Sequence, residues 1–462
     1  MTLWQADDEK SPDDRVLAFT SSLEVDYRLY PYDIRASIAW AEALADAGAL
    51  APDQKERIVD SLREIKDELD RDELELDPEL EDIHMNIEKE LTERLPEDGP
   101  RLHFGRSRND QVLVDVKLYL RDEVHQLQEQ LAGLLDVLSG RAGDHLDTYL
   151  PGYTHLQPAQ PISLAHYLLA YFQKFRRDFA RLQKCYEALD ELPLGSGALA
   201  GSGVDIDRQK LAQELDFSSI SKNSLDAVSE RDFMFDILNA LTQLSVHASR
   251  LCEDWILWST PGFDFLEFAD EFTTGSSIMP QKQNPDVAEL IRGQTGRLTG
   301  ALQGLITVVK AQPLAYNRDL QEDKVHTFAA VDCVKSWLGL LGEMVNTVEF
   351  KTENMQEALE SGYPGATDLA DYLVEKGVAF RQAHNDVRKL VEGAFAEGKR
   401  LEELELSDLK QVNEEFEEEV FNLLSAEEST ARRNLPGGTG AGAVKDQLEA
   451  ARSWLVDHGY FG

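Results

Sequence analysis

The chain has 462 residues, with 86 acidic against 46 basic side chains and a formal net charge of −40. Hydrophobic residues make up 42% of it, which supports a large core and excludes a disordered protein. The acidity argues against nucleic acid and against an anionic membrane surface as partners, because phosphate groups require a basic surface.

Targeting and cysteine features favour a cytoplasmic protein. No apolar run approaches the roughly 18 residues of a transmembrane helix, and residues 1–10 are too polar for a signal peptide. Cys185, Cys252 and Cys333 lie far apart and form no CxxC pair. We therefore expect reduced thiols that pack as small hydrophobic side chains.

The hydrophobic pattern predicts an all-α protein. Shorter helices are expected first, at 34–47 and 54–69, the second with a charged, solvated face. Long helices follow, in which apolar residues recur at alternating steps of three and four. We expect them at 109–138, 162–191, 229–258, 286–311 and 324–348, with the longest at 162–191. No alternation indicates a sheet.

The change from short helical patterns at both ends of the chain to long ones in the middle predicts three domains. An N-terminal helical domain covers 1–105, a central long-helix bundle covers 106–354, and a small helical domain covers 355–462. In the last domain, breaks are expected at 362–365 and at a glycine-rich connector, 436–442, before the final helix. The apolar stripes of the central helices are wider than one neighbour would cover, so we expect subunits to share helices.

Three polar segments interrupt the long helices. In 274–286, Ser276 follows a glycine in a loop, Lys282 and Asn284 add a cation and an amide donor, and Pro285 starts the next helix. The arginines of 103–111 suit a carboxylate clamp, and 152–161 places His155 in a loop that enters a helix. The alternatives are an ordinary capped loop, a solvated cap formed by Asn109 or Asp110, and a structural histidine.

Other chemistries lack their motifs. There is no HExxH and no Cys/His cluster, Asp82 and His84 stand alone, and no dinucleotide-binding glycine fingerprint follows a strand. A serine hydrolase would need a nucleophile elbow on a sheet. The sequence therefore favours acid–base chemistry on an anionic substrate, with no metal and no cofactor.

In order and spacing these segments resemble the fumarase/aspartase superfamily, whose GSSxMPxKxNP signature is matched at 275–285. Within it, the pattern is most similar to the argininosuccinate lyases. Eight segments carry that similarity: 82–84, 105–111, 151–157, 193–201, 223–232, 288–293, 316–324 and 366–377. The resemblance implies a three-domain, all-helical fold and a homotetramer whose central bundle pools helices from four subunits. It also implies active sites that each draw on three chains.

The implied reaction splits argininosuccinate into L-arginine and fumarate, the last step of arginine biosynthesis, through an aci-carboxylate carbanion. By resemblance, Ser276 is the base, and Lys282 and Asn284 hold the carboxylate that gains charge. His155, oriented by Glu289, protonates the leaving group. The substrate-binding positions implied by the resemblance are Ser22, Arg108, Asn109, Thr154, Arg231, Tyr316, Gln321 and Lys324.

Three alternatives remain open at this stage. The chain could be a sister enzyme, such as an adenylosuccinate lyase or a fumarase, which would release fumarate from another substrate. It could be a non-catalytic structural homologue, or a helical scaffold for partner proteins. The chain also departs from the family at its start, where Gln5 follows Trp4 in place of a Gly-Gly-Arg-Phe arm, and at Phe104.

The acidic excess predicts a salt response. We expect both the unfolding temperature and the activity to rise when KCl increases from about 0.1 M to about 1 M, because the screening length falls from about 10 Å to about 3 Å and weakens self-repulsion. Thermal unfolding followed by circular dichroism and a parallel rate assay would measure this, with NaCl as the control. Stability and activity that stay constant or fall with salt would contradict the prediction.

Overall fold

The computed structural model describes residues 13–360 and 363–460, so the family arm, which falls in residues 1–12, lies outside the described residues. Two compact units make up the chain. Unit 1 comprises 1–128, 180–243 and 296–335, and unit 2 comprises 129–179, 244–295 and 336–462. The three predicted domains follow the chain order instead and stay a prediction.

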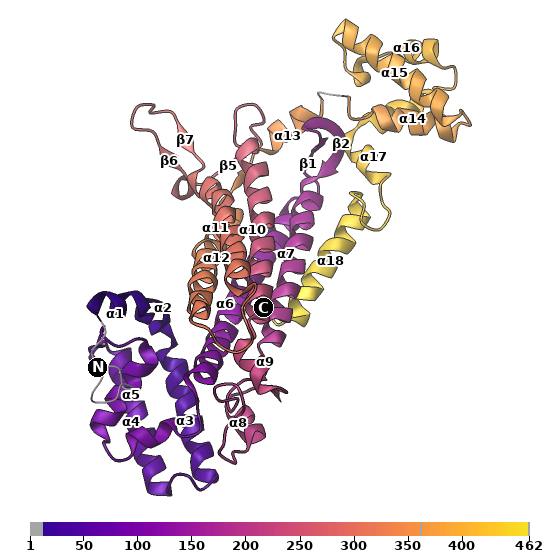
Figure 1. The fold of residues 1–462 in the computed structure, drawn as a ribbon. Coiled ribbons are helices and arrows are strands. Elements are labelled where there is room, and N and C mark those ends of the chain that lie inside the picture. Colours follow the sequence, from indigo (N-terminus) through magenta and orange to yellow (C-terminus); the bar gives the residue numbers. More distant parts are fainter. Residues whose placement is uncertain (1–12, 361–362, 461–462) are drawn as a thin grey trace. The chain divides into compact units, whose positions relative to one another are not determined.

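The five long helices are confirmed (Figure 1): α6 (Arg108–Asp144), α7 (Leu164–Ala188), α10 (Asp232–Trp258), α11 (Asp286–Val309) and α12 (Glu322–Thr347). The prediction of the longest one is wrong. Helix α6 has 37 residues and α7 has 25, because the apolar stripe of α6 continues past Leu138 to the fully buried Ala142. Among the described residues, no helix is both long and apolar enough to cross a bilayer.

Short helices precede and connect the long ones in unit 1. Buried residues of α3, among them Trp40, form much of the core there, and the Trp40 indole donates to the Phe104 carbonyl. The α3 and α4 helices confirm the two shorter helices predicted for this region. The elements are α1 (Asp14–Thr20), α2 (Leu23–Asp26), η1 (Tyr27–Leu29), α3 (Tyr30–Asp46), α4 (Pro52–Asp70), α5 (Ile83–Arg94), η2 (Gly99–His103), α8 (Arg208–Glu214), α9 (Ser224–Ser229) and η4 (Arg318–Gln321).

Segments of the long helices pack together within each unit. In unit 1, Lys335 of α12 pairs with Glu123 of α6 at 2.6 Å. In unit 2, Tyr171 of α7 donates to Asp254 of α10 at 2.6 Å. Each unit therefore has a helical bundle whose stripes interlock as expected for long amphipathic helices.

The all-α fold class is confirmed, and the expectation that the chain offers no sheet is wrong only for four short two-stranded pairs (Figure 1). The main one is the antiparallel hairpin of β1 (Tyr149–Thr154) and β2 (Gln157–Ser163), whose connecting residues His155 and Leu156 have φ of 55° and 57°. Two positive φ values are what a two-residue hairpin turn requires. The other pairs are β3 (Glu191–Leu192) with β4 (Ser219–Ile220), β5 (Leu266–Glu267) with β8 (Glu349–Phe350), and β6 (Thr274–Gly275) with β7 (Gln283–Asn284). A single turn, η3 (Asp270–Phe272), precedes β6.

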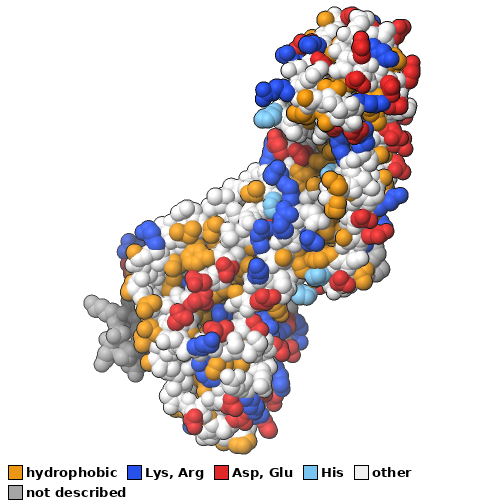
Figure 2. All heavy atoms as spheres, turned by 90° about the vertical axis from the view of Figure 1, so that its right-hand side faces the viewer, with side chains coloured by type: hydrophobic (Ala, Val, Ile, Leu, Met, Phe, Trp, Pro, Cys, Tyr) orange, Lys and Arg blue, Asp and Glu red, His pale blue; other side chains and the backbone are white. Residues whose placement is uncertain are grey.

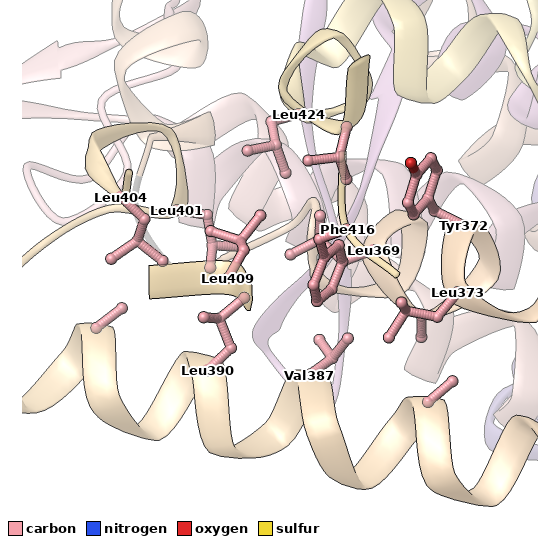
Figure 3. Close-up of a cluster of buried hydrophobic side chains, with 14 residues drawn as sticks. Leu369, Tyr372, Leu373, Val387, Leu390, Leu401, Leu404, Leu409, Phe416 and Leu424 are labelled. Carbon is pink, nitrogen blue, oxygen red and sulfur yellow. The ribbon is translucent and has the colours of Figure 1, made fainter. Parts of the chain in front are cut away.

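The segment at 366–424 has a core of its own, shown in Figure 3. On α15, the buried residues Ala383, Val387, Leu390 and Ala394 recur at helical spacing and belong to this core, and Figure 3 shows Val387 pointing toward the fully buried Phe416. The elements after α12 are α13 (Thr352–Leu359), α14 (Ala366–Glu375), α15 (Phe380–Glu397), η5 (Leu401–Glu403), α16 (Leu406–Val412), η6 (Glu418–Leu424), α17 (Ala426–Ala431) and α18 (Ala441–Asp457).

The glycine-rich segment before α18 is a connector, as predicted. A Cβ at Gly438 would lie 2.1 Å from the Arg433 carbonyl, so only glycine fits this tight return of the chain. Asn434 caps the following helix by accepting from the Ala443 N–H at 2.7 Å.

The prediction that the cysteines pack inside the protein agrees with the structure. Cys185, Cys252 and Cys333 are all buried. Figure 2 shows acidic side chains spread over the visible face and interspersed with basic ones, so they are not gathered in one patch there. This distribution is typical of a solvated acidic surface.

Candidate functional site

A cavity of about 230 Å³ in unit 1 brings together seven of the eight predicted substrate-binding residues. They come from segments that are far apart in the chain. The seven are Ser22, Arg108, Asn109, Arg231, Tyr316, Gln321 and Lys324. Asp26, Glu81, Asp82, Val112 and Arg318 complete the lining, which therefore carries four basic and three acidic side chains. In a chain of net charge −40, this is a local excess of positive charge that suits a polycarboxylate.

Two helix starts form the acidic wall of the cavity. Ser22 precedes α2 and donates to Asp26 Oδ2 at 2.5 Å, while Asp26 Oδ1 accepts from the Ile83 N–H at 3.1 Å. Asp82 is the N-cap of α5 and accepts from the Met85 N–H at 2.7 Å. Burial, reinforced by the charge of Asp82, holds the pKa of Asp26 above its usual value. These carboxylates are fixed in place by backbone donors of α5.

Arg108 begins α6 and is held on two sides. Its Nε lies 3.1 Å from Asp82 Oδ2, and its Nη1 donates to Gln111 Oε1 at 2.7 Å. Its Nη2 is buried, lies 3.8 Å from Glu88 Oε2, and has no hydrogen-bond acceptor among the described residues. Because Nη2 is enclosed by the protein, any contact to a ligand is left to the part of the side chain that lines the cavity.

A glycine loop anchors the start of α6. Asp110 is fully buried, and its Oδ2 accepts from the N–H groups of Gly195 and Gly197 at 3.0 Å and 2.7 Å. Asn109 Nδ2 donates to the Ala198 carbonyl of the same loop at 3.1 Å. The interpretation of Asp110 as a solvated cap is therefore wrong, because its carboxylate ties 193–201 to the helix that carries Arg108.

The two cations on the opposite wall share one buried carboxylate. Asp323 accepts from Arg231 Nε and from Lys324 Nζ, the latter at 3.0 Å, and all three side chains are at most 5% exposed. Burial works to raise the pKa of Asp323, but the cations of Lys324 and Arg231 outweigh it and leave that pKa below its usual value. Asp323 therefore stays ionised and keeps both cations charged inside the protein.

The η4 turn supplies the remaining polar groups. Arg318 Nη1 lies 3.0 Å from Glu81 Oε1, and Gln321 Nε2 donates to the Thr20 carbonyl at 3.2 Å. Burial raises the pKa of Tyr316, so its phenol remains a donor at neutral pH. These contacts connect the segment 316–324 to the N-terminal helices around the cavity.

Sequence reasoning missed several members of this site. Asp82 and Arg318 belong to segments that carried the family resemblance, and that position is the signal that could have assigned them. Asp323 adjoins Lys324 in the chain, but only the fold reveals that it also holds Arg231. The prediction that the arginines of 103–111 form a carboxylate clamp is wrong for Arg106. This residue donates to Ser37 Oγ at 2.8 Å and does not line the cavity.

His84 does not stand alone, contrary to expectation. Its Nδ1 lies 3.2 Å from Asp33 Oδ1 and 3.3 Å from Asp115 Oδ2, and all three side chains are at most 1% exposed. Asp33 comes from α3 and Asp115 from α6, and the two residues lie 82 positions apart in the chain. This explains why no sequence motif indicated the group.

The predicted catalytic residues belong to unit 2. Ser276 opens the loop between β6 and β7, where its Oγ accepts from the N–H groups of Ile278 and Met279 at 3.3 Å and 3.1 Å. Both amides donate to the oxygen that would carry the charge if the hydroxyl lost its proton. Asn284 lies on β7, where it is half-buried, and Lys282 is exposed in the loop before it.

The other predicted unit 2 residues are also accessible. Thr154 and His155 are exposed, with Thr154 ending β1 and His155 at the tip of the hairpin. Glu289, in the first turn of α11, pairs with Arg292 at 3.9 Å. Among the described residues, no hydrogen bond or ion pair joins His155 to Glu289 or to the loop of Ser276, so the predicted orientation of His155 stays a prediction.

Known proteins resemble this chain over nearly its whole length. The sequence matches the family described as Lyase over residues 9–300, and the family described as Argininosuccinate lyase C-terminal over residues 363–431. The argininosuccinate lyase of Heliobacterium mobile is 49% identical, over 98% of this chain and 99% of the relative. That of Moorella thermoacetica is 48% identical, over 99% and 98%.

Solved structures share the fold. An EDDS lyase in complex with formate superimposes with a TM-score of 0.84 at 25% identity, over 97% of this chain and 92% of that structure. A class II fumarase from Schistosoma mansoni gives a TM-score of 0.76 at 16% identity, over 90% and 94%, and shows the fold alone.

Fold and sequence together define the class of this chain, which is a lyase of the fumarase/aspartase superfamily. Nearly half of its residues are identical to those of full-length relatives, and the C-terminal match is specific to one branch. The chain belongs to the argininosuccinate lyase family. It is therefore an enzyme, a carbon–nitrogen lyase.

Asp323→Asn is predicted to destabilise the protein. The substitution leaves Arg231 and Lys324 buried without a counter-ion, so we expect the free energy of unfolding near neutral pH to fall by about 3–5 kcal/mol. Because the folded pKa of Asp323 lies below its unfolded value, its contribution is complete above about pH 4 and is lost as the pH falls through the folded pKa.

Chemical denaturation across a pH series would measure both effects. Glu322→Gln, which removes the adjacent exposed carboxylate on α12, is the control and should change stability by less than about 0.5 kcal/mol. An Asp323→Asn variant as stable as the wild type would show that the buried cations do not depend on this carboxylate.

Proposed function

We propose that the chain cleaves argininosuccinate to L-arginine and fumarate by cofactor-free β-elimination, with the predicted residues in the roles given below. One observation carries the proposal: seven predicted substrate-binding residues, chosen by resemblance, line a single cavity. These residues come from four separate stretches of sequence, so chance does not readily explain why all seven line the same cavity. The names of the relatives support the choice of substrate.

The cavity has the chemistry that the substrate requires. Argininosuccinate carries three carboxylates, and Arg108, Arg231, Arg318 and Lys324 offer four cations. The substrate also has a guanidinium group, for which Asp26, Glu81 and Asp82 offer carboxylates in the same cavity. Tyr316, Asn109, Ser22 and Gln321 add neutral hydrogen-bonding groups that can fix its orientation.

The proposed reaction begins at the carbon beside the succinate carboxylate. Ser276, with its Oγ hydrogen-bonded by two loop amides, removes a proton from that carbon and leaves an aci-carboxylate carbanion. Lys282 and Asn284 stabilise the doubled charge on the carboxylate. The C–N bond then breaks, its electron pair goes to the guanidino nitrogen, and His155, oriented by Glu289, delivers the proton directly or through water. Thr154 contacts the substrate beside His155.

The full active site is proposed to form in a homotetramer with shared sites. The substrate-binding cavity belongs to unit 1, whereas Ser276, His155 and Lys282 belong to unit 2. Apolar side chains exposed on the long helices, such as Leu290 on α11 and Leu340 on α12, supply surface for subunit contacts. The enzyme is proposed to act in the cytoplasm, in arginine biosynthesis.

A fumarate-release assay tests the substrate. We expect absorbance of fumarate to appear with argininosuccinate, and not with adenylosuccinate or malate at the same concentration. Product with adenylosuccinate or malate alone would assign a sister activity, and no product with any of the three would favour a structural homologue.

Two substitutions test the catalytic roles. We expect Ser276→Ala to lower kcat by about 10³-fold or more while KM changes little, because the base acts only in the chemical step. His155→Asn should also lower kcat by about 10²–10⁴-fold, the range of acid–base contributions. Steady-state fumarate release measures both. Ser277→Ala, next to the base, is the matched control, and retained turnover in Ser276→Ala would move the base elsewhere.

Mixed subunits test the shared site. At a substrate concentration near the wild-type KM, the Arg108→Ala and Ser276→Ala preparations should each show little activity, because the first binds substrate weakly and the second lacks the base in every site. After the two preparations are dissociated and reassembled together, we expect activity to return to a substantial fraction of the wild-type value, since some sites then receive both intact parts. Reassembly of each variant alone is the control, and mixtures that stay inactive would contradict sharing between subunits.

A further inference from the structure

The buried group behind the cavity is not used by the proposed reaction. We call Asp33, His84 and Asp115 the carboxyl–imidazole cluster. Each residue lies on a helix that forms the cavity region: α3, α5, whose N-cap is Asp82, and α6, which starts with Arg108. All three side chains are at most 1% exposed, so the cluster has no direct access to a ligand in the cavity.

A continuous chain of hydrogen bonds connects the cluster to the cavity. Arg108 Nη1 donates to Gln111 Oε1 at 2.7 Å, and Gln111 Nε2 donates to Asp33 Oδ1 at 2.5 Å. The same Asp33 oxygen lies 3.2 Å from His84 Nδ1. Gln111 is only 2% exposed, so water does not replace either of its contacts.

The orientation of the Gln111 amide decides whether it supports Arg108. An ionised carboxylate only accepts hydrogen bonds, so Asp33 requires the NH₂ group of Gln111, and the amide oxygen must then face the guanidinium. If Asp33 could donate, the amide could turn and present its NH₂ group to Arg108, where donor would meet donor. Ionised Asp33 therefore orients the Gln111 amide so that its Oε1 accepts the hydrogen bond from Arg108.

The surroundings keep the two carboxyls of the cluster in different states. Burial works to raise the pKa of Asp33, but the hydrogen bond and charge of His84 outweigh it and lower the pKa to about 2. Burial raises the pKa of Asp115 well above its usual value, and the charge of Asp33 adds to the rise. Arg106 acts on both carboxyls, while Glu88, Asp26 and Asp82 are the nearby acidic groups. These opposed shifts indicate that Asp33 is ionised and that Asp115 is protonated.

We propose that the carboxyl–imidazole cluster positions Arg108 through Gln111, so that the part of its side chain that lines the cavity faces a substrate carboxylate. These are positioning residues, since they touch no substrate. The inference rests on the proposed function, because Arg108 is taken there to bind substrate. The same three side chains could hold a divalent cation, but the positive charges of Arg106 and Arg108 act on Asp115 and oppose a second cation there.

A double-mutant cycle tests the inference by steady-state kinetics. We expect Asp33→Asn and Gln111→Met each to raise KM for argininosuccinate about tenfold, with kcat changed by less than about threefold, since they loosen a ground-state contact. In an Arg108→Ala background, the same substitutions should change KM by less than about twofold, because their effect passes through Arg108. Asp115→Asn should raise KM less than Asp33→Asn, because an amide preserves the donor of a protonated carboxyl.

Matched controls separate positioning from stability and from the proposed function. Asp178→Asn removes another buried carboxylate paired with a histidine, His247, in unit 2, and should leave KM unchanged. A crystal structure of Gln111→Met should show the Arg108 guanidinium displaced, a readout that does not depend on activity. If the wild type fails to release fumarate from argininosuccinate, the proposed function is wrong and the crystal structure still decides the positioning role.

Three outcomes would overturn the inference. The first is a KM of Gln111→Met equal to that of the wild type. The second is an effect of Asp33→Asn that persists undiminished in the Arg108→Ala background. The third is a rise in the wild-type unfolding temperature on addition of Zn²⁺ that is absent in His84→Gln, which would make the cluster a metal site.

Discussion

The cavity depends on the pairing of each of its cations with a carboxylate of the chain, of which Asp82 is held by a backbone N–H and Asp323 by two cations. Asp323 pairs with Arg231 and Lys324, Asp82 pairs with Arg108, and Glu81 pairs with Arg318. A guanidinium or ammonium group taken out of water is costly unless it is paired. Since each counter-charge already belongs to the chain, the cations stay oriented while the cavity is empty, and a substrate carboxylate meets donors that need little rearrangement.

Helix starts concentrate this arrangement in one place. Ser22 and Asp82 are the residues before α2 and α5, Arg108 is the first residue of α6, and Lys324 lies in the first turn of α12. The N-terminal end of a helix carries unpaired N–H groups and a partial positive charge, which favour anions. The Asp82 carboxylate satisfies part of that demand within the protein. The bundle thus contributes to anion binding by its geometry as well as by its side chains.

The sequence permits prediction of the long helices and of most of the cavity lining, for different reasons. The stripes of α7 and α11 repeat over seven turns of helix or nearly so, and a signal of that length outweighs local exceptions. The residues that line the cavity could be predicted only because they belong to segments that match a specific family pattern. The β1–β2 hairpin was missed because Pro151, Pro158 and Pro161 interrupt any alternation of polar and apolar residues. Asp33 and Asp115 were missed because each is a single acidic residue within a helix, and only tertiary contacts bring them to His84.

The loop of the proposed base Ser276 belongs to unit 2, whereas the cavity belongs to unit 1. The serine Oγ is already hydrogen-bonded by two amides, while Ile278 and Met279 beside it are 85% and 42% exposed. Apolar side chains at the tip of a loop gain stability when the loop closes over a ligand or another surface. Closure of that kind would also remove water from the serine, so that the amides and Lys282 stabilise charge more strongly than they do in solvent. In the proposed reaction, a base that became effective only on closure would be protected from side reactions while the site is empty, and burial of the exposed apolar pair would supply part of the free energy for closing.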